Sequence, residues 1–297
     1  MTEAPLLKPT SQSYRGTVTD PELWSRWSPR VGDVIVCTPA KCGTTWTQTI
    51  VAMLLNGGPK LGGKVPVLSP WVDGDLGVPS EQVIADLAQQ TGRRVVKTHT
   101  PPDGFPLWGG VSMVAVYRHP LDVFFSLRKH TENQVSADED HPMKRPVSES
   151  LRDYVERPGD VDNIDSDVLE TFVWHYSETV RSGRWSALTL LHYNDMLRAP
   201  RKCVSKLAKA LAVDADEETI DEITKATSFG AMKARAADFA PVAGTGFWKS
   251  DKSFFDAGST GKWADKLSTA DVARFRARWA ALLPDSEARR WIEQGAR

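Results

Sequence analysis

Short apolar runs alternate with amphipathic stretches along most of this chain. Four runs rich in β-branched residues, at 33–37, 93–98, 112–117 and 187–193, predict buried strands, because strands covered on both faces are almost continuously apolar. Helices are predicted at 44–55, 168–181, 200–211, 216–226 and 269–283. This alternation predicts parallel βαβ units in an α/β fold, with one open sheet flanked by helices on both faces.

The ends of several elements carry their own signals. Asn56-Gly57-Gly58 ends the first predicted helix, and Pro120 can open a helix directly after the third strand. Ser268 and Asp271 have the spacing of a capping box. The least regular stretches are 56–80, 131–165 and 236–262, which we expect to form lids and a substrate pocket; the acidic run at 138–141 is expected to be solvated.

Composition narrows the class of protein. The chain has 297 residues, 41% hydrophobic and 25% charged, and a formal net charge of −1, so nothing in its overall charge favours nucleic acid or a membrane surface. We predict a single domain over 1–297. The three cysteines do not form a disulfide framework, and neither a leader nor a membrane span is evident, so a cytoplasmic protein is expected.

The strongest local signal is the segment 38–46, between a predicted strand and a predicted helix. Backbone N–H groups at such a junction point at an anion, and the helix dipole favours negative charge there. Gly43 permits close approach, Thr44 and Thr45 add hydroxyls, and Lys41 adds a positive charge. This predicts a P-loop-like phosphate site, although an ordinary turn with a surface lysine explains the local chemistry equally well.

A second glycine-rich segment, 58–64, has the spacing of a Walker A motif. Val65 stands where that motif needs a magnesium-binding hydroxyl, and the segment follows a helix end instead of a strand. We therefore do not expect a nucleotide there.

Five segments, in order, resemble the cytosolic-type PAPS-dependent sulfotransferases, where PAPS is 3′-phosphoadenosine-5′-phosphosulfate. The first is 38–46, similar to the family's 5′-phosphosulfate loop, with Lys41 and Gly43-Thr-Thr-Trp46 intact and Cys42 at a Ser/Ala position. The others are 95–101, 117–126, 192–196 and 227–232. The resemblance implies PAPS as co-substrate, 3′,5′-adenosine bisphosphate (PAP) as product, and no metal.

The resemblance also implies catalytic roles. His99, in Lys97-Thr-His99-Thr-Pro101, matches the catalytic base, and an imidazole can take a hydroxyl proton near neutral pH. Lys97 is expected beside the transferred sulfuryl group, and Lys41 beside the leaving phosphate. Ser126 is the fourth catalytic candidate. A lone histidine at a strand end would more simply be a packing residue.

Donor binding is implied for a wider set of residues. The phosphate loop supplies Lys41, Cys42, Gly43, Thr44, Thr45 and Trp46, and the remaining candidates are Arg118, Ser126, Tyr193, Thr227, Phe229, Met232 and Gly258. Arg118 and Ser126 keep the family's spacing for the 3′-phosphate, which suits a guanidinium and a hydroxyl. The aromatic and apolar residues are expected to enclose the adenine.

The C-terminal segment departs from the family. About 236–263 is expected to cover the donor, but Asp256 and Ala257 replace the family's Arg-Lys before Gly258. We expect Lys262, Lys252 or Lys249 to supply the missing charge; weaker affinity for PAPS, or a donor without a 3′-phosphate, stays open. The family's dimer motif after Trp263 is not kept, and the sequence predicts no oligomeric state.

These observations predict in-line sulfuryl transfer to a hydroxyl or amine of a small, apolar or aromatic acceptor. Candidate lining residues are Phe105, Trp108, Phe124, Phe247 and Trp248, which core packing explains as well. Two alternatives stay open. One is a P-loop kinase or NTPase, and the other is a nucleotide-binding protein that has lost catalysis.

Overall fold

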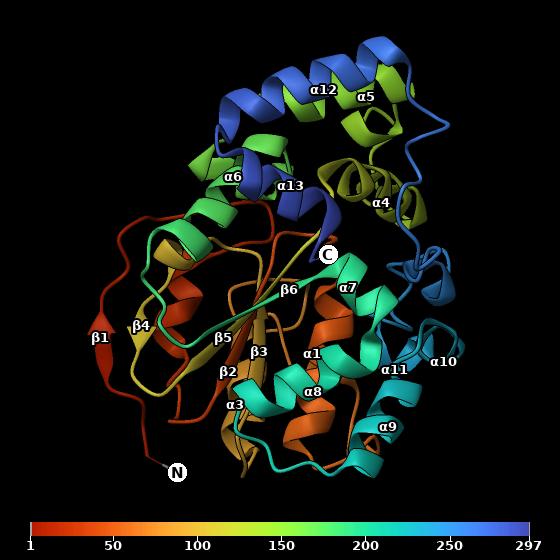
Figure 1. The fold of residues 1–297 in the computed structure, drawn as a ribbon. Coiled ribbons are helices and arrows are strands. Elements are labelled where there is room, and N and C mark those ends of the chain that lie inside the picture. Colours follow the sequence, from red (N-terminus) through yellow and green to blue (C-terminus); the bar gives the residue numbers. More distant parts are fainter. Residues whose placement is uncertain (1, 297) are drawn as a thin grey trace.

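A four-stranded parallel sheet forms the centre of the molecule (Figure 1). The computed structural model describes residues 2–296. The strands are β2 (Val34–Cys37), β3 (Val95–Thr98), β5 (Ser112–Tyr117) and β6 (Leu188–His192), in the order β3-β2-β5-β6. All three pairings are parallel, which confirms the four predicted strands and the α/β class.

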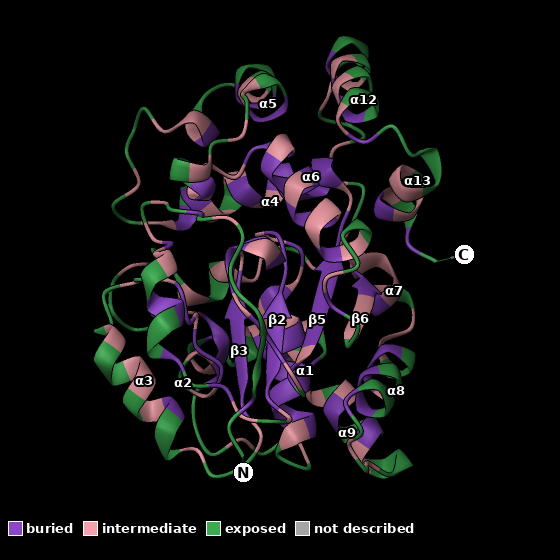
Figure 2. Ribbon diagram, turned by 90° about the vertical axis from the view of Figure 1, so that its left-hand side faces the viewer, coloured by how far each residue is buried: buried purple, intermediate pink, exposed green. Residues whose placement is uncertain are grey.

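Successive residues of the strands point to opposite faces of the sheet, and each face has its own cover. Val34 and Val36 pack on α1 (Thr44–Leu55), α8 (Pro200–Ala210) and α9 (Glu217–Ala226). Ile35 packs on the other face, against Trp24 and against Leu87 of α3 (Ser80–Gln89). Figure 2 shows the buried strands lying between these two covers. The sheet is therefore flanked by helices on both faces, as the sequence predicts.

A second hydrophobic cluster lies beyond the carboxyl ends of the strands. It involves helices α4 (Pro120–Asn133), α5 (Val147–Glu156), α6 (Leu169–Tyr176), α12 (Thr269–Leu282) and α13 (Ser286–Gln294). Figure 1 shows this layer above the sheet, with α12 lying along α5. Loops between the layer and the strand ends enclose the candidate site.

The predicted helices are confirmed, and their termini show why they form. Pro120 opens α4 in the first turn, where its missing N–H has no intrahelical partner to lose. Ser268 and Asp271 form a reciprocal capping box at the start of α12. The helix expected at 168–181 is α6 followed by a π-helical turn, Ser177–Arg181.

Several other elements were not predicted from the sequence. The expectation of irregular structure is wrong for 147–156, because α5 buries Leu151, Tyr154 and Val155 in the second cluster. The remaining short elements are β1 (Leu6–Lys8) paired antiparallel with β4 (Leu107–Trp108), α2 (Val65–Leu68), α7 (Tyr193–Arg198), α10 (Phe229–Ala234) and α11 (Ala236–Phe239). None of the described helices is long and apolar enough to cross a membrane.

Candidate active site

The ends of all four central strands open into one cavity of about 650 Å³. The loop at 38–43 follows β2, His99 follows β3, Arg118 follows β5 and Tyr193 follows β6, and all four contribute to its wall. The chain leaves β2 toward β3 on one side and returns to β5 on the other. In open parallel sheets this switch point is where ligands bind.

The loop between β2 and α1 has the backbone of an anion cradle. Lys41 and Gly43 have positive φ angles of 62° and 105°. A Cβ on Gly43 would lie 3.0 Å from the ring of Tyr193, so glycine also meets a spatial demand. No side chain caps α1 at Gly43, which leaves the first N–H groups of the helix free for an anion. The hydroxyls of Thr38 and Thr44 are 2.6 Å apart.

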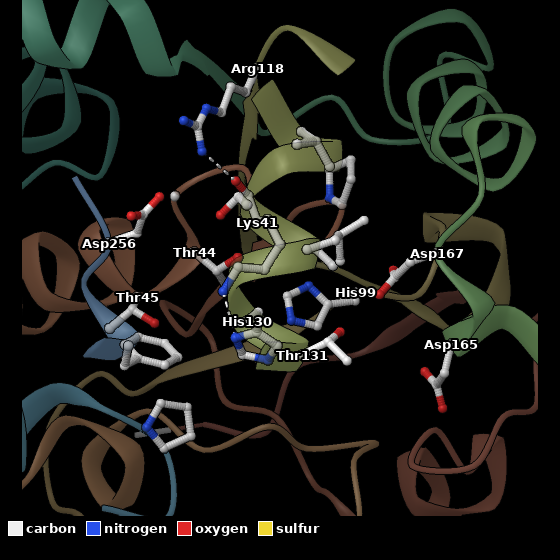
Figure 3. A pocket seen from close by; sticks show the side chains of 18 of the residues that line it. Lys41, Thr44, Thr45, His99, Arg118, His130, Thr131, Asp165, Asp167 and Asp256 are labelled. Carbon is white, nitrogen blue, oxygen red and sulfur yellow. Dashed lines mark hydrogen bonds between the residues drawn. The ribbon is translucent and has the colours of Figure 1, made fainter. Parts of the chain in front are cut away.

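Lys41 reaches from this loop into the cavity (Figure 3). Its Nζ lies 2.8 Å from Nδ1 of His130 on α4 and 4.9 Å from the centre of the Phe254 ring. Burial, followed by the positive charges of Lys97 and Arg118, lowers the pKa of Lys41 to about 7. A bound anion would act against both the burial and the neighbouring positive charges, so it would raise the pKa of Lys41 and favour its charged form.

His99 is held in a defined tautomer. Its Nδ1 lies 2.8 Å from the carbonyl oxygen of Thr38, which can only accept, so Nδ1 carries the proton and the lone pair lies on Nε2, where it accepts a hydrogen bond from Lys97. Lys97 Nζ lies 3.3 Å from that Nε2 and 4.2 Å from the centre of the Trp71 ring. Burial, and then the charge of Lys97, lower the pKa of His99 well below its ordinary value, while burial lowers the pKa of Lys97 to about 8.

A buried carboxylate behind this strand end has no counterpart in the sequence analysis. Asp73 Oδ2 accepts hydrogen bonds from Thr98 Oγ1 at 2.8 Å, Thr100 Oγ1 at 2.7 Å and Trp24 Nε1 at 3.1 Å. Burial raises its pKa to about 6. It fixes the residues on either side of His99. No spacing or motif in the sequence marks it.

Arg118 lies at the end of β5 with most of its guanidinium engaged by backbone. Nη1 donates to the carbonyl of Lys41 at 3.3 Å and Nη2 to the carbonyl of Ser259 at 2.9 Å, while Nε has no partner among the described residues. The guanidinium carbon lies 4.3 Å from the centre of the Tyr193 ring. Ser126, from α4, lines the same cavity.

The predicted adenine-binding residues gather on one side of the cavity. Trp46 meets Tyr193 edge-on at 5.8 Å between ring centres, and Thr227, Phe229 and Met232 line the wall beside them. Gly258 has a φ of 56°, and a Cβ there would lie 2.5 Å from the Phe229 ring. All the other predicted site residues line the cavity, but Cys42 does not: its side chain is buried in the second cluster.

Asp256, which replaces a positively charged residue of the family pattern, is paired with nearby lysines. Asp256 forms an ion pair with Lys262, and its backbone carbonyl accepts from Lys233 Nζ at 3.1 Å. Of the three lysines proposed to supply charge, Lys262 lines the cavity, whereas Lys249 and Lys252 are exposed and do not.

The segment around Lys262 is anchored to α4 by a single carboxylate. Asp122 accepts from the backbone N–H of Gly261 at 3.0 Å and of Lys262 at 3.1 Å. This contact ties the C-terminal segment to the helix that carries Ser126 and His130. The sequence analysis missed it, since Asp122 and Gly261 are far apart in the chain.

The remaining part of the cavity is largely apolar and comes only in part from the three stretches predicted to form a pocket, because α4, α6 and the 17–19 segment also line it. Its apolar residues include Trp71, Leu76, Leu127, Met143, Tyr154, Phe172, Phe247 and Trp248. Phe105, Trp108 and Phe124 belong to the core and do not reach it. Two acidic residues, Asp165 and Asp167, also line this part.

Comparison with known proteins identifies the class of this chain. Residues 31–287 match the family described as "Sulfotransferase domain". The chain therefore belongs to the sulfotransferase family and is an enzyme that transfers sulfur-containing groups. It is 29% identical over 321 residues to a glycolipid sulfotransferase of Mycobacterium bovis, covering 96% of this chain and 94% of that protein. It is 27% identical to Sulfotransferase 1B1 of Canis lupus familiaris, covering 83% and 81%.

Solved structures share the fold. A mouse sulfotransferase complexed with PAP has a TM-score of 0.66 at 18% identity, over 93% of this chain and 92% of that one. Retinol dehydratase in a complex with retinol and PAP has a TM-score of 0.69 at 19% identity, over 90% and 85%. The fold predicted from the sequence is thereby confirmed.

Proposed function

We propose that this sulfotransferase uses PAPS as donor and transfers its sulfuryl group to a hydroxyl or amine of a small, apolar or aromatic acceptor. The observation that carries the proposal is the tautomer of His99, which leaves a neutral Nε2 lone pair in the cavity beside Lys97 and across from the phosphate loop. The PAP bound to related folds supports the choice of donor.

In the proposed reaction, His99 Nε2 takes the proton of the acceptor hydroxyl. The acceptor oxygen forms a bond to sulfur as the bond from sulfur to the bridging oxygen breaks, and PAP leaves with that electron pair. Lys41 faces the charge that develops on the leaving phosphate, and Lys97 faces the sulfuryl oxygens. Preorganised positive charge and positioning of this kind dominate related phosphoryl transfers.

Three residues support a site for the 3′-phosphate. Arg118 Nε has no partner within residues 2–296, Ser126 presents a hydroxyl from the next helix, and Lys262 brings a positive charge to the same cavity. Lys262 also forms an ion pair with Asp256, so the site would bind a 3′-phosphate less tightly than one in which the lysine had no acidic partner.

A glycolipid acceptor is the second candidate. It is favoured by the similarity to the mycobacterial glycolipid sulfotransferase, which extends over 96% of this chain. The reacting group would then be a sugar hydroxyl, with the same use of His99. A panel that includes simple phenols, sterols and glycolipids would decide between these classes.

Calorimetric titration with PAP and with 5′-AMP, without metal, tests the donor. We expect PAP to bind at least about tenfold more tightly, since a charge-assisted phosphate contact contributes more than 1.4 kcal/mol. Equal binding of the two nucleotides would contradict a PAPS donor.

Replacement of the base tests the chemistry. His99→Asn should lower sulfuryl transfer by about 100-fold or more while PAP binding stays within about twofold, because general base catalysis contributes about 10²–10⁴-fold. Turnover of wild-type size in this variant would show that His99 is not the base.

A further inference from the structure

The acceptor side of the cavity contains one carboxylate that has no partner among the residues that the structure describes. Asp165 accepts from the backbone N–H groups of Val18 at 2.7 Å and Thr19 at 2.9 Å, and from the Thr19 hydroxyl. For Asp167, by contrast, no side-chain hydrogen bond or ion pair occurs with any residue from 2 to 296. Figure 3 shows the carboxylate of Asp167 directed toward the space around His99, while that of Asp165 points away.

The backbone holds Asp167 in a costly conformation. It has φ 50° and ψ 49° at the end of a short 3₁₀ segment, Val161–Ser166. Left-handed backbone is uncommon for residues other than glycine, although aspartate and asparagine tolerate it best. Such conformations concentrate at ligand sites, because surrounding structure must keep them in place.

The surroundings of Asp167 leave its charge poorly compensated. Lys41 and Arg157 are the cations whose charges reach it, but Arg157 is engaged by Asp153 and by the carbonyl of Ser166. Lys41 and Lys97 are assigned to the donor in the proposed function. With a polyanionic donor present, the acceptor space would therefore face an uncompensated negative charge.

The nearby side chains also suit a cation. Tyr154 and Phe172 line the cavity together with Asp167, and Phe247 and Trp248 lie on the wall formed by the C-terminal segment. Aromatic faces attract ammonium groups in addition to apolar carbon. A neutral apolar acceptor would use the rings but would leave this half-buried carboxylate without a partner among residues 2–296, which is unfavourable.

We propose that Asp167 is a specificity-determining residue that selects acceptors carrying a protonated amine in addition to the hydroxyl that receives the sulfuryl group. This inference rests on the proposed function and narrows its acceptor class to aromatic or apolar amino alcohols. The carboxylate binds the ammonium and thereby orients the hydroxyl toward Nε2 of His99.

Binding of such an amine would change the protonation of the site. Burial, and then the charge of Asp165, raise the pKa of Asp167 to about 7, whereas Lys41 and Arg157 act in the opposite direction. Cys42 and Tyr154 are the other titratable groups that sense its charge. A bound ammonium lowers the pKa of Asp167, so amine binding near pH 7 should release protons from this carboxyl.

The test compares three ligands of matched shape, measured by calorimetry on the complex of the protein with PAP and repeated without PAP. Tyramine carries the amine, tyrosol carries a hydroxyl in its place, and 4-propylphenol carries a methyl group. We expect tyramine to bind at least about tenfold more tightly than either, the effect of one hydrogen bond to a charged group. Titration in two buffers of different ionisation enthalpy measures the released proton.

Asp167→Asn keeps the shape and the left-handed backbone but removes the charge. It should abolish the preference for tyramine and the proton release, while binding of 4-propylphenol and PAP changes by less than about twofold. Asp162→Asn is the matched control, because Asp162 is exposed on the same segment and does not line the cavity. It should behave like the wild type.

Equal affinity for tyramine and tyrosol, or a tyramine preference that survives Asp167→Asn, would overturn the inference. Both results leave the donor assignment intact provided that PAP still binds. Failure of PAP to bind would contradict the proposed function instead. In that case the tyramine preference measured without PAP would still support or overturn the role of Asp167.

Discussion

At the scale of single residues, hydrogen bonds to backbone decide what the titratable groups can do. The carbonyl of Thr38 places the proton of His99 on Nδ1, so the lone pair lies on Nε2, beside Lys97. Because Asp256 forms an ion pair with Lys262, it competes with the 3′-phosphate for this lysine. Each effect depends on one contact, so a single substitution can test it.

Removal of the charge at Asp256 should strengthen donor binding. Asp256→Asn frees Lys262 to face the 3′-phosphate and eliminates a like charge, so PAP should bind about 3–10-fold more tightly in calorimetry. The affinity for 5′-AMP should change much less. Asp265→Asn, at an exposed position outside the cavity, is the control. Weaker PAP binding by Asp256→Asn would mean that Asp256 supports the site.

Donor affinity should also depend on pH. The pKa of Lys41 is lowered to about 7 and that of Lys97 to about 8, and an anion favours their charged forms, so binding takes up protons. PAP has the phosphate that Lys41 faces but no sulfuryl group for Lys97, so its Kd should rise between pH 7 and 9 through Lys41, by up to about tenfold per pH unit. The phosphates, with a second pKa of about 6, are already ionised in this range. A constant Kd over this range would contradict the assignment.

At the scale of elements, the site depends on where helices and strands begin and end. The uncapped start of α1 leaves N–H groups for an anion, while α4 carries Ser126 and His130 on the opposite wall. Asp122, in the first turn of α4, ties the C-terminal segment to that wall. The pairing of one helix with one distant loop thus completes the donor side.

Loss of this tie should loosen the C-terminal segment. In Asp122→Asn, an amide N–H₂ replaces one acceptor oxygen and faces the N–H groups of Gly261 and Lys262, so one of these hydrogen bonds is lost. We expect PAP binding to weaken about 5–10-fold. Limited trypsin digestion should cleave faster after Lys262 or Lys266, and saturating PAP should slow it. Wild-type cleavage rates would contradict this role; Asp265→Asn serves again as the control.

At the scale of the whole molecule, residues from 17 to 262 converge on one edge of one sheet. The donor side uses the ends of β2, β5 and β6 together with α10 and the 254–262 segment. The acceptor side uses loops that are apart in the chain. Burial also lowers the pKa of the histidines, so the stability of the fold should depend on pH.

The protein should lose stability in mild acid. Burial lowers the pKa of all six histidines, so the unfolded chain binds more protons as pH falls below about 6.5. Each buried histidine contributes stability that is present above its unfolded pKa and is lost as pH falls, by up to about 1.4 kcal/mol per unit, and the more exposed His141 contributes less because solvent screens its charge. Asp73 and Asp167, whose pKa values are raised to about 6 and about 7, offset part of this loss.

Urea unfolding at pH 7.5 and pH 5.5 measures this effect. The midpoint should fall at the lower pH with little change in the slope, since the surface exposed on unfolding stays the same. A midpoint that is unchanged or higher at pH 5.5 would show that the histidines are not buried in their neutral form. Addition of PAP at each pH gives the separate contribution of ligand binding.

The four central strands, the five predicted helices and the phosphate loop were predictable from the sequence alone. Apolar β-branched runs and helical periodicity are local signals, and a loop between a strand and a helix has little freedom in where it points. The five ordered motifs also indicated the family and brought His99, Lys41 and Arg118 forward as candidates. In each case the information lies within a few neighbouring residues.

Tertiary structure decided the rest, because it depends on contacts between distant segments. Helix α5 forms by burying Tyr154 in a cluster that its own sequence does not reveal. The ion pair of Asp256, the anchor at Asp122 and the unpartnered carboxylate of Asp167 all depend on which side chains meet across the cavity. Hydrogen bonds and charges act over a few ångströms in space, whereas motifs record only neighbours along the chain.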